Sequence, residues 1–305
     1  MYEAFTGSLE LGMLYAVMAL GVYVTFRILD FPDLTVDGSF TTGGAIAAVM
    51  ISSGVSPLLA TLAAFGGGLV AGACTGLLHT KGKVNALLSG ILMMIALYSI
   101  NLRIMGKKAN IALLGEDTLL TGVSLLWVMP IVVLAIKFAL DWFLHTDLGL
   151  ALRATGDNPR MIRSFGVNTD NTIIVGVSLS NGLVALSGAL IAQYSAFADV
   201  SMGIGMIVIG LASVIIGEAL FGAKTVIRAT LAVLLGAIIY RLIVALALRV
   251  GLESTDMKLM TALIVIIALT LPMVRSKLRQ KSVIRQRAAD LEHSRARNVS
   301  AGGGR

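Results

Sequence analysis

The chain has 305 residues, of which 57% are hydrophobic and only 13% are charged. Soluble domains average roughly 45–50% apolar and about 25% charged residues, so this composition cannot coat a water-soluble globule. It also excludes a disordered chain, which would need low hydrophobicity and high charge. The net charge of +7 does not indicate a nucleic-acid-binding face, because nine of the 24 Lys and Arg residues follow residue 274. The remaining class is a helical membrane protein, in which each span needs about 20 mostly apolar residues.

Apolar segments between charge clusters predict nine candidate membrane spans. The second and the seventh are short enough to be broken or re-entrant helices. The predicted fold class is therefore an all-α integral membrane protein, a polytopic bundle of about 8–10 transmembrane helices. The nine segments lie near residues 8–28, 40–54, 57–79, 84–101, 121–141, 172–198, 205–222, 226–249 and 257–274.

The distribution of basic residues predicts the orientation of these spans. No Lys or Arg precedes the first span and Arg27 follows it, which favours a retained first span with an outer N-terminus. More Lys and Arg then fall on the cytoplasmic side than outside, as the positive-inside rule requires. We expect residues 1–274 to form the membrane domain, with residues 146–171 cytoplasmic, and residues 275–305 to form a basic, disordered cytoplasmic tail.

The longest polar interruption before the tail covers residues 142–171 and has a helical pattern. Its segment DLGLALRAT carries an apolar stripe and ends before Gly156, which we predict to be a C-capping glycine. Asp157 or Asn158 offers an N-cap, Pro159 suits a first turn, and the segment RMIRSFG forms a second short helix. The sequence thus predicts two short cytoplasmic helices joined by a tight turn. The alternative is an interfacial helix that lies on the lipid headgroups.

The segment LGLALRATGDNPRMIRSFGVN (148–168) resembles the cytoplasmic coupling segment of ABC-importer permeases of the branched-chain amino-acid and ribose type. SNGLVALSGALIAQYSAFAD (180–199) and MGIGMIVIGLASVIIGEALFG (202–222) continue the resemblance in the expected order. FPDLTVDGSFTTGGAIAA (31–48) resembles a subgroup associated with uptake of tryptophan or other amino acids. The resemblance covers roughly residues 8–275, and only the tail departs from it.

The resemblance implies a permease subunit of the bacterial plasma (inner) membrane that has no catalytic activity of its own. Its implied partners are cytoplasmic ABC ATPase subunits, an extracellular or periplasmic solute-binding protein, the lipid bilayer, and a second permease copy, either identical or a close homologue. ATP and Mg²⁺ would belong to the ATPase, and we expect this chain to bind no cofactor, because its sequence has no GxxxxGK[ST] phosphate loop. The implied solute is an amino acid, and aromatic amino acids such as tryptophan are the first candidates. Branched-chain amino acids, sugars and nucleosides are the alternatives.

The resemblance also assigns the two short helices of 148–166 to the transmission of ATPase movement. Their arginines would supply charge for the partner surface. The residues expected to couple to the ATPase are Gly149, Arg153, Ala154, Gly156, Asp157, Asn158, Pro159, Arg160, Arg163 and Gly166.

Polar residues inside the spans are the second set of candidates, because burying them without partners is expensive. Glu218 and Arg241 are predicted to pair as a structural salt bridge; the alternative places Glu218 near the membrane edge. Lys137 is expected to extend toward a span end rather than to pair. Uncharged polar residues would line the translocation path or hydrogen-bond neighbouring helices: Asn85, Ser89, Ser180, Asn181 and Gln193.

Two other functions remain open at this point. Asp33 and Asp37 stand four residues apart and could hold a divalent metal in a membrane-embedded transferase, although a turn or helix cap explains both more simply. An ion-coupled secondary transporter would need an embedded titratable group, for which Glu218 is the candidate. The three histidines have no metal-ligand spacing, so we predict no metal site.

Overall fold

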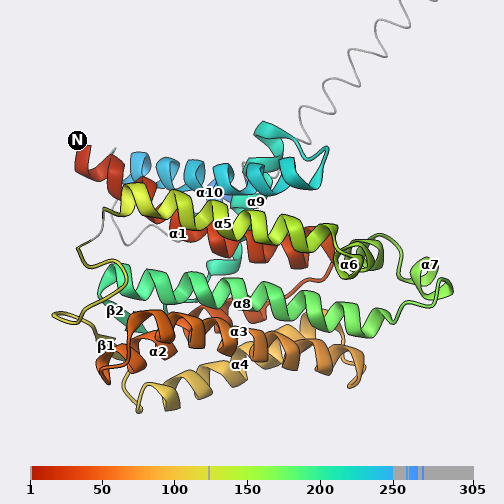
Figure 1. The fold of residues 1–305 in the computed structure, drawn as a ribbon, viewed down its shortest axis with the longest axis horizontal. Coiled ribbons are helices and arrows are strands. Elements are labelled where there is room, and N and C mark those ends of the chain that lie inside the picture. The colour runs from red at the N-terminus through yellow and green to blue at the C-terminus, as the bar shows by residue number, and fades with distance from the viewer. Residues whose placement is uncertain (1, 123, 250–258, 260, 267–269, 271–305) are drawn as a thin grey trace, which may run out of the picture. The chain divides into compact units, whose positions relative to one another are not determined.

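The computed structural model describes residues 2–122, 124–249, 259, 261–266 and 270. The chain divides into two compact units, Met1–Ala262 and Leu263–Arg305, and all the labelled helices and strands lie in the first (Figure 1). The predicted polytopic helical bundle is confirmed. Its only β-structure among the described residues is a pair of three-residue antiparallel strands, β1 (Asn110–Ala112) and β2 (Phe197–Asp199).

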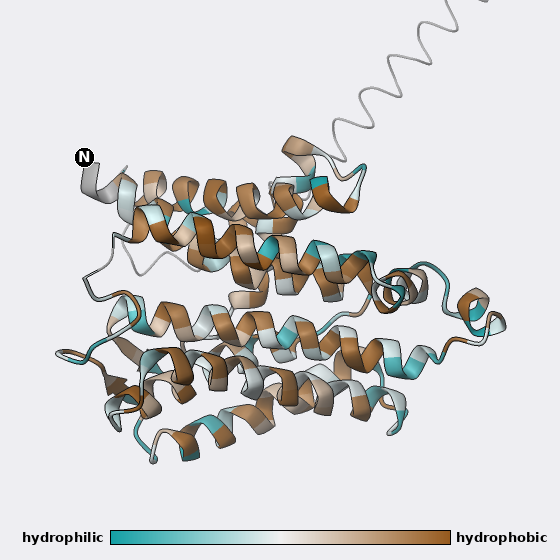
Figure 2. Ribbon diagram, in the orientation of Figure 1, coloured by the Kyte–Doolittle hydropathy of each residue, from teal (hydrophilic) through white to brown (hydrophobic). Residues whose placement is uncertain are grey.

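Within the described part of the chain, six helices are long and apolar enough to cross a membrane. Their apolar residues run along most of each helix, whereas hydrophilic residues concentrate in the connections (Figure 2). These six are α1 with the π-helical turn η1 (Phe5–Ile28), α3 (Pro57–Thr80), α4 (Ala86–Ile104), α5 (Leu125–His145), α8 (Thr169–Ser195) and α10 (Val226–Arg249).

Two further predicted spans are shorter helices. The seventh is α9 (Met206–Phe221), whose 16 residues fit the expectation of a short helix. The second is α2 (Thr35–Ser52), which begins five residues before the predicted start. Its first turns are polar yet buried, because the Thr41 and Thr42 hydroxyls donate to the backbone carbonyls four residues earlier. Most of the ninth predicted span, 257–274, and the whole predicted tail fall outside the described residues.

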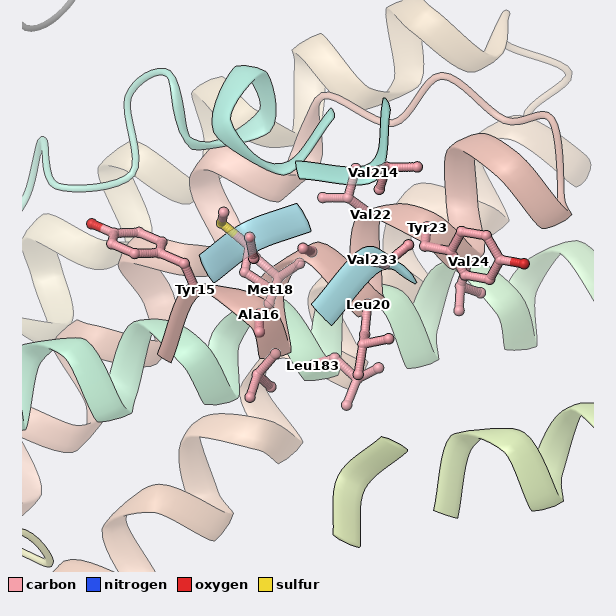
Figure 3. Close-up of a cluster of buried hydrophobic side chains, with 14 of the residues drawn as sticks. Tyr15, Ala16, Met18, Leu20, Val22, Tyr23, Val24, Leu183, Val214 and Val233 are labelled. Atoms are coloured by element: carbon pink, nitrogen blue, oxygen red, sulfur yellow. The ribbon is translucent and has the colours of Figure 1, made fainter. Parts of the chain in front are cut away.

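Helix α1 (Tyr2–Tyr23) is the centre of the core. In its most apolar 18-residue window 78% of residues are buried, against 22% for the peripheral α4. A helix that is apolar on every side must be surrounded by other helices. Leu183 of α8, Val214 of α9 and Val233 of α10 pack around it (Figure 3).

Helix α8 lies between α1 and the layer formed by α2 and α3 (Figure 1). Glycines allow the backbones to approach: Gly68 and Gly72 of α3 face the α8 backbone, and so does Gly43 of α2. Small residues at such contacts are typical of helix packing in membranes, where close van der Waals contact replaces the hydrophobic driving force. Helix α8 therefore packs against both α1 and the α2–α3 layer. The short helices α6 and α7 precede α8 in the chain.

Candidate functional site

The predicted pair of short helices is present at one end of the bundle (Figure 1). It consists of α6 (Asp147–Asp157) and α7 (Pro159–Ser164). Asn158 separates them: its backbone is extended, with φ −156°, and its side chain accepts a hydrogen bond from the Met161 amide at 3.1 Å. Asn158 is thus the N-cap of α7, and Pro159 occupies the first turn as expected.

The predicted role of Gly156 as a left-handed C-cap is wrong. Gly156 lies inside α6, which continues to Asp157, and its φ is not positive. A Cβ atom at this position would overlap the carbonyl oxygen of Ile28, so glycine is needed for close backbone contact with the end of the first span. The extended Asn158 ends the helix instead. Gly166, after α7, does have a positive φ of 85°.

One face of α6 is fixed to the bundle. Gly149, Leu152 and Thr155 are buried, and the Thr155 hydroxyl lies 2.9 Å from that of Thr172 in α8. Helix α7 has no buried residue. Large apolar side chains on the pair or directly after it are exposed, among them Met161 of α7 at 50% and Phe165, which follows α7, at 74%. Helix α6 is thus held to the bundle, whereas apolar side chains remain exposed on and beside α7.

The three arginines of this segment have different surroundings. Arg163 is used internally, because its Nε donates to Thr169 Oγ1 at 2.5 Å and its Nη2 lies 3.4 Å from Asp170 Oδ1. Arg160 is exposed. Arg153 is half-buried and lines a cavity instead of the outer face. The other coupling candidates, Ala154 half-buried and Asp157 exposed, also lie on α6.

A cavity of about 240 Å³ joins α6 to the ends of α1 and α9. Basic and acidic side chains both line this cavity. The basic ones are Arg27, Arg153 and Lys224, and the acidic ones are Asp157 and Glu218. Within it, Arg27 Nε lies 2.9 Å from Glu218 Oε1. In the sequence, Arg27 served only to predict the orientation of the first span. It lies in η1 at the end of that span, next to Ile28, which contacts Gly156, and it is therefore part of this junction.

The predicted salt bridge between Glu218 and Arg241 is wrong. Glu218 lies in the last turn of α9, near the edge of the bundle as the alternative held, and its partner is Arg27. Arg241 lies over the Tyr15 ring, with its guanidinium carbon 4.5 Å from the ring centroid. Glu218 and Arg241 lie on neighbouring helices but at different heights, because Gly217, next to Glu218, contacts Ala232 of α10, nine residues before Arg241.

Lys137 is buried and paired, contrary to the expectation that it extends to a span end. Its Nζ lies 2.5 Å from Asp141 Oδ2, one helical turn further along α5. The Thr230 hydroxyl of α10 donates to Asp141 Oδ1 at 2.7 Å. This polar contact holds α5 to α10 inside the bundle.

The uncharged candidates for the translocation path form internal hydrogen bonds. Asn181 donates to Asp33 Oδ2 and accepts from the Ser39 hydroxyl, each at 2.6 Å. Ser180 donates to the Gly21 carbonyl at 2.7 Å. The remaining three also bond within the chain: Gln193 to Thr61, Ser89 to the Ala86 carbonyl, and Asn85 to the Leu87 amide as the N-cap of α4. Asn181, Ser180 and Gln193 thus bond to other segments of the chain, whereas Asn85 and Ser89 bond within α4.

Asp33 and Asp37 do not converge on one site. Asp33 accepts a hydrogen bond from the Thr35 amide, as a residue before a helix does, and a second one from the Asn181 side chain. Asp37 reaches across to α9, where it accepts the amides of Gly205 and Ile207, each at 2.8 Å. The Asp37 side chain of α2 therefore caps the N-terminus of α9, whose own N-cap residue is Gly205. No group of three His, Cys, Asp or Glu side chains that could hold a metal was found among the described residues.

Comparison with known proteins identifies relatives of this chain. Residues 5–270 match the family described as branched-chain amino acid transport system, permease component. A tyrosine transport system permease protein of Clostridioides difficile is 49% identical over 83% of this chain and 86% of its own length. The ribose import permease protein RbsC of Escherichia coli is 28% identical over 83% of this chain and 80% of its own. The autoinducer 2 import system permease protein LsrC of Salmonella paratyphi B is 30% identical over 73% and 65%, respectively.

Proposed function

The chain belongs to the permease family of branched-chain amino acid transport systems. From that premise we propose that it moves an amino acid into the cell, and that an aromatic amino acid is the first candidate. The observation that carries the choice of solute is the 49% identity to a permease named for tyrosine transport, against 28% for one named for ribose. Sugars are the second candidate, because the ribose relative covers the same share of this chain.

A separate ATPase would drive the transport. The support for this is the form of α6 and α7: α6 is held to the bundle by Gly156 and Leu152, while exposed Met161 and Phe165 are available to a partner. ATP and Mg²⁺ would be bound by that partner. A movement imposed on α6 would reach the end of the first span directly through Ile28.

The remaining assembly follows from the same premise. The α6 and α7 pair and the C-terminus would face the cytoplasm of a bacterium, and a solute-binding protein would dock at the opposite face of the inner membrane. Two permease copies, identical or homologous, would form the complex. Outer labelling of a cysteine introduced at Arg160 would contradict this orientation.

The direct test is uptake by the complex reconstituted in proteoliposomes with its ATPase and binding protein. We expect ATP-dependent uptake of labelled tyrosine or tryptophan, and little uptake of ribose. Uptake of ribose alone would reassign the solute. Uptake that follows an imposed ion gradient and needs no ATP would indicate a secondary transporter.

A further inference from the structure

Two charged side chains lie within the spans at the end of the bundle away from α6 and α7. Glu10 is on α1, whose N-terminus lies at that end (Figure 1), and Arg241 is eight residues before the end of α10. At 1.5 Å per residue, Arg241 is about 12 Å inside that end of its helix. This is the end to which a binding protein would deliver solute.

The two charges do not neutralise each other. Glu10 contacts the Tyr194 hydroxyl of α8, which donates to Glu10 Oε2 at 3.2 Å. Arg241 lies over the face of Tyr15, and within the described part of the chain it forms no ion pair. A charge inside a span is expensive unless it has a partner or faces water, and such residues usually serve a function.

The backbone fixes the spacing of these groups. Gly12 of α1 lies against Ile238 of α10, where an added Cβ would be 2.9 Å from the Ile238 Cα. Gly12 stands between Glu10 and Tyr15 in sequence, and Ile238 is one turn before Arg241. The close approach of α1 and α10 therefore sets Arg241 beside Tyr15.

Aromatic side chains complete the cluster. Tyr194 of α8 is within electrostatic range of both Glu10 and Arg241. Tyr15 is in turn stacked on Phe40 of α2, with ring centroids 6.3 Å apart. Three helices thus bring one carboxylate, one guanidinium and two tyrosine rings together. Glu10, Tyr194 and Arg241 are all partly exposed, whereas Tyr15 is buried behind them.

We propose that Glu10, Tyr194, Tyr15 and Arg241 form an outer binding site for the zwitterion of an aromatic amino acid. Glu10 would accept the α-ammonium group and Arg241 would donate to the α-carboxylate in place of its contact with Tyr15. The released ring of Tyr15, with that of Tyr194, would contact the aromatic side chain of the solute. This proposal rests on the proposed function and adds the residues that read the solute.

The test measures binding of labelled tyrosine to the permease–ATPase complex in nanodiscs, without the binding protein. Two analogues compete: tyramine, which lacks the carboxylate, and 4-hydroxyphenylpropionate, which lacks the amine. Glu10→Gln and Arg241→Gln should each weaken tyrosine binding about tenfold or more, since each removes a charged hydrogen-bond partner. Glu10→Gln should also abolish the preference for tyrosine over 4-hydroxyphenylpropionate, and Arg241→Gln the preference over tyramine.

Arg249→Gln, an exposed arginine at the end of the same helix, is the matched control and should bind tyrosine as the wild type does. Assembly with the ATPase and basal ATP hydrolysis report correct folding. Arg241→Lys, which keeps the charge, replaces Arg241→Gln if that variant does not assemble, and should weaken tyrosine binding less than the loss of charge at Glu10.

Wild-type binding of tyrosine with unchanged affinity and analogue preference in Glu10→Gln and in the Arg241 variant would overturn this inference and leave the proposed function standing. A wild-type complex that transports ribose and no amino acid would overturn both.

Discussion

Gly156 of α6 and Ile28 at the end of the first span are in backbone contact, and a single methyl group on Gly156 would overlap the Ile28 carbonyl oxygen. This contact links the short helices directly to the central helix of the core. Because α1 is surrounded by α8, α9 and α10, a displacement of α6 would be transmitted into a close-packed interior, which tolerates shifts of about 1 Å poorly.

Gly156→Ala should therefore uncouple ATP hydrolysis from transport while leaving membrane insertion intact. The added methyl group must push α6 away from Ile28, at a cost of about 1–3 kcal/mol for overpacking. Transport and solute-stimulated ATP hydrolysis of the reconstituted complex provide the measurement. Gly66→Ala on α3 is the control, because nothing lies within 4 Å of a Cβ built there. Wild-type coupling in Gly156→Ala would show that α6 is only a surface helix.

The positions of the helices could be predicted from the sequence, whereas most of the contacts between them could not. Apolar length determines a span, so α10 was predicted at its observed bounds, 226–249. The partner of Glu218 depends on how α1, α9 and α10 are rotated and shifted, which hydropathy does not encode. The pairing of Lys137 could have been predicted from the sequence, because Asp141 stands four residues later on the same helical face. The prediction that Gly156 is a C-cap was wrong because a glycine near a helix end can either form the turn that ends the helix or allow another backbone to come close.

The pairing of Arg27 with Glu218 predicts a pattern of charge exchange. Arg27→Glu and Glu218→Arg should each lower transport, because each places like charges together beside the cavity next to α6. The double exchange should restore part of it. Stability should change by less than about 1 kcal/mol, since Arg27 is 61% exposed. Restoration of transport by exchanging Glu218 with Arg241 instead would contradict the observed pair.

The capping of α9 by Asp37 predicts a loss of stability on its removal. Asp37→Ala leaves the Gly205 and Ile207 amides without their acceptor, which should cost about 1–2 kcal/mol. Asp37→Asn keeps one acceptor oxygen and should lose less. Thermal unfolding of the detergent-purified protein measures both, with exposed Asp117→Ala as the control. Equal melting temperatures for Asp37→Ala and Asp117→Ala would refute the capping role.

The buried pair of Lys137 and Asp141 predicts opposite outcomes for single and double substitution. Lys137→Met leaves a buried carboxylate without its cation and should destabilise the protein by about 3–5 kcal/mol. Replacing both, as Lys137→Met with Asp141→Leu, removes the uncompensated charge and should recover much of that loss. Denaturant unfolding of the three variants measures the coupling. Additive losses in the double variant would show that the two side chains act independently.

The last prediction concerns which arginine meets the ATPase. All three arginines of the segment were expected to supply charge to the partner surface, and Arg153 was the first choice for a docking test. In the structure, however, Arg153 lines the cavity and Arg163 contacts Thr169 and Asp170. Arg160 is exposed, so its charge is available to a partner surface.

Arg160→Glu should therefore weaken ATPase docking by reversing that charge. The loss should be larger at about 0.01 M salt than at 0.15 M, because the screening length falls from about 30 Å to about 8 Å. Arg297→Glu, in the tail, makes the same change of charge and should leave docking unaltered. Co-purification of the ATPase at the two salt concentrations is the measurement. A salt-independent loss in Arg160→Glu would mean that the substitution acts on the shape of α7 rather than through its charge.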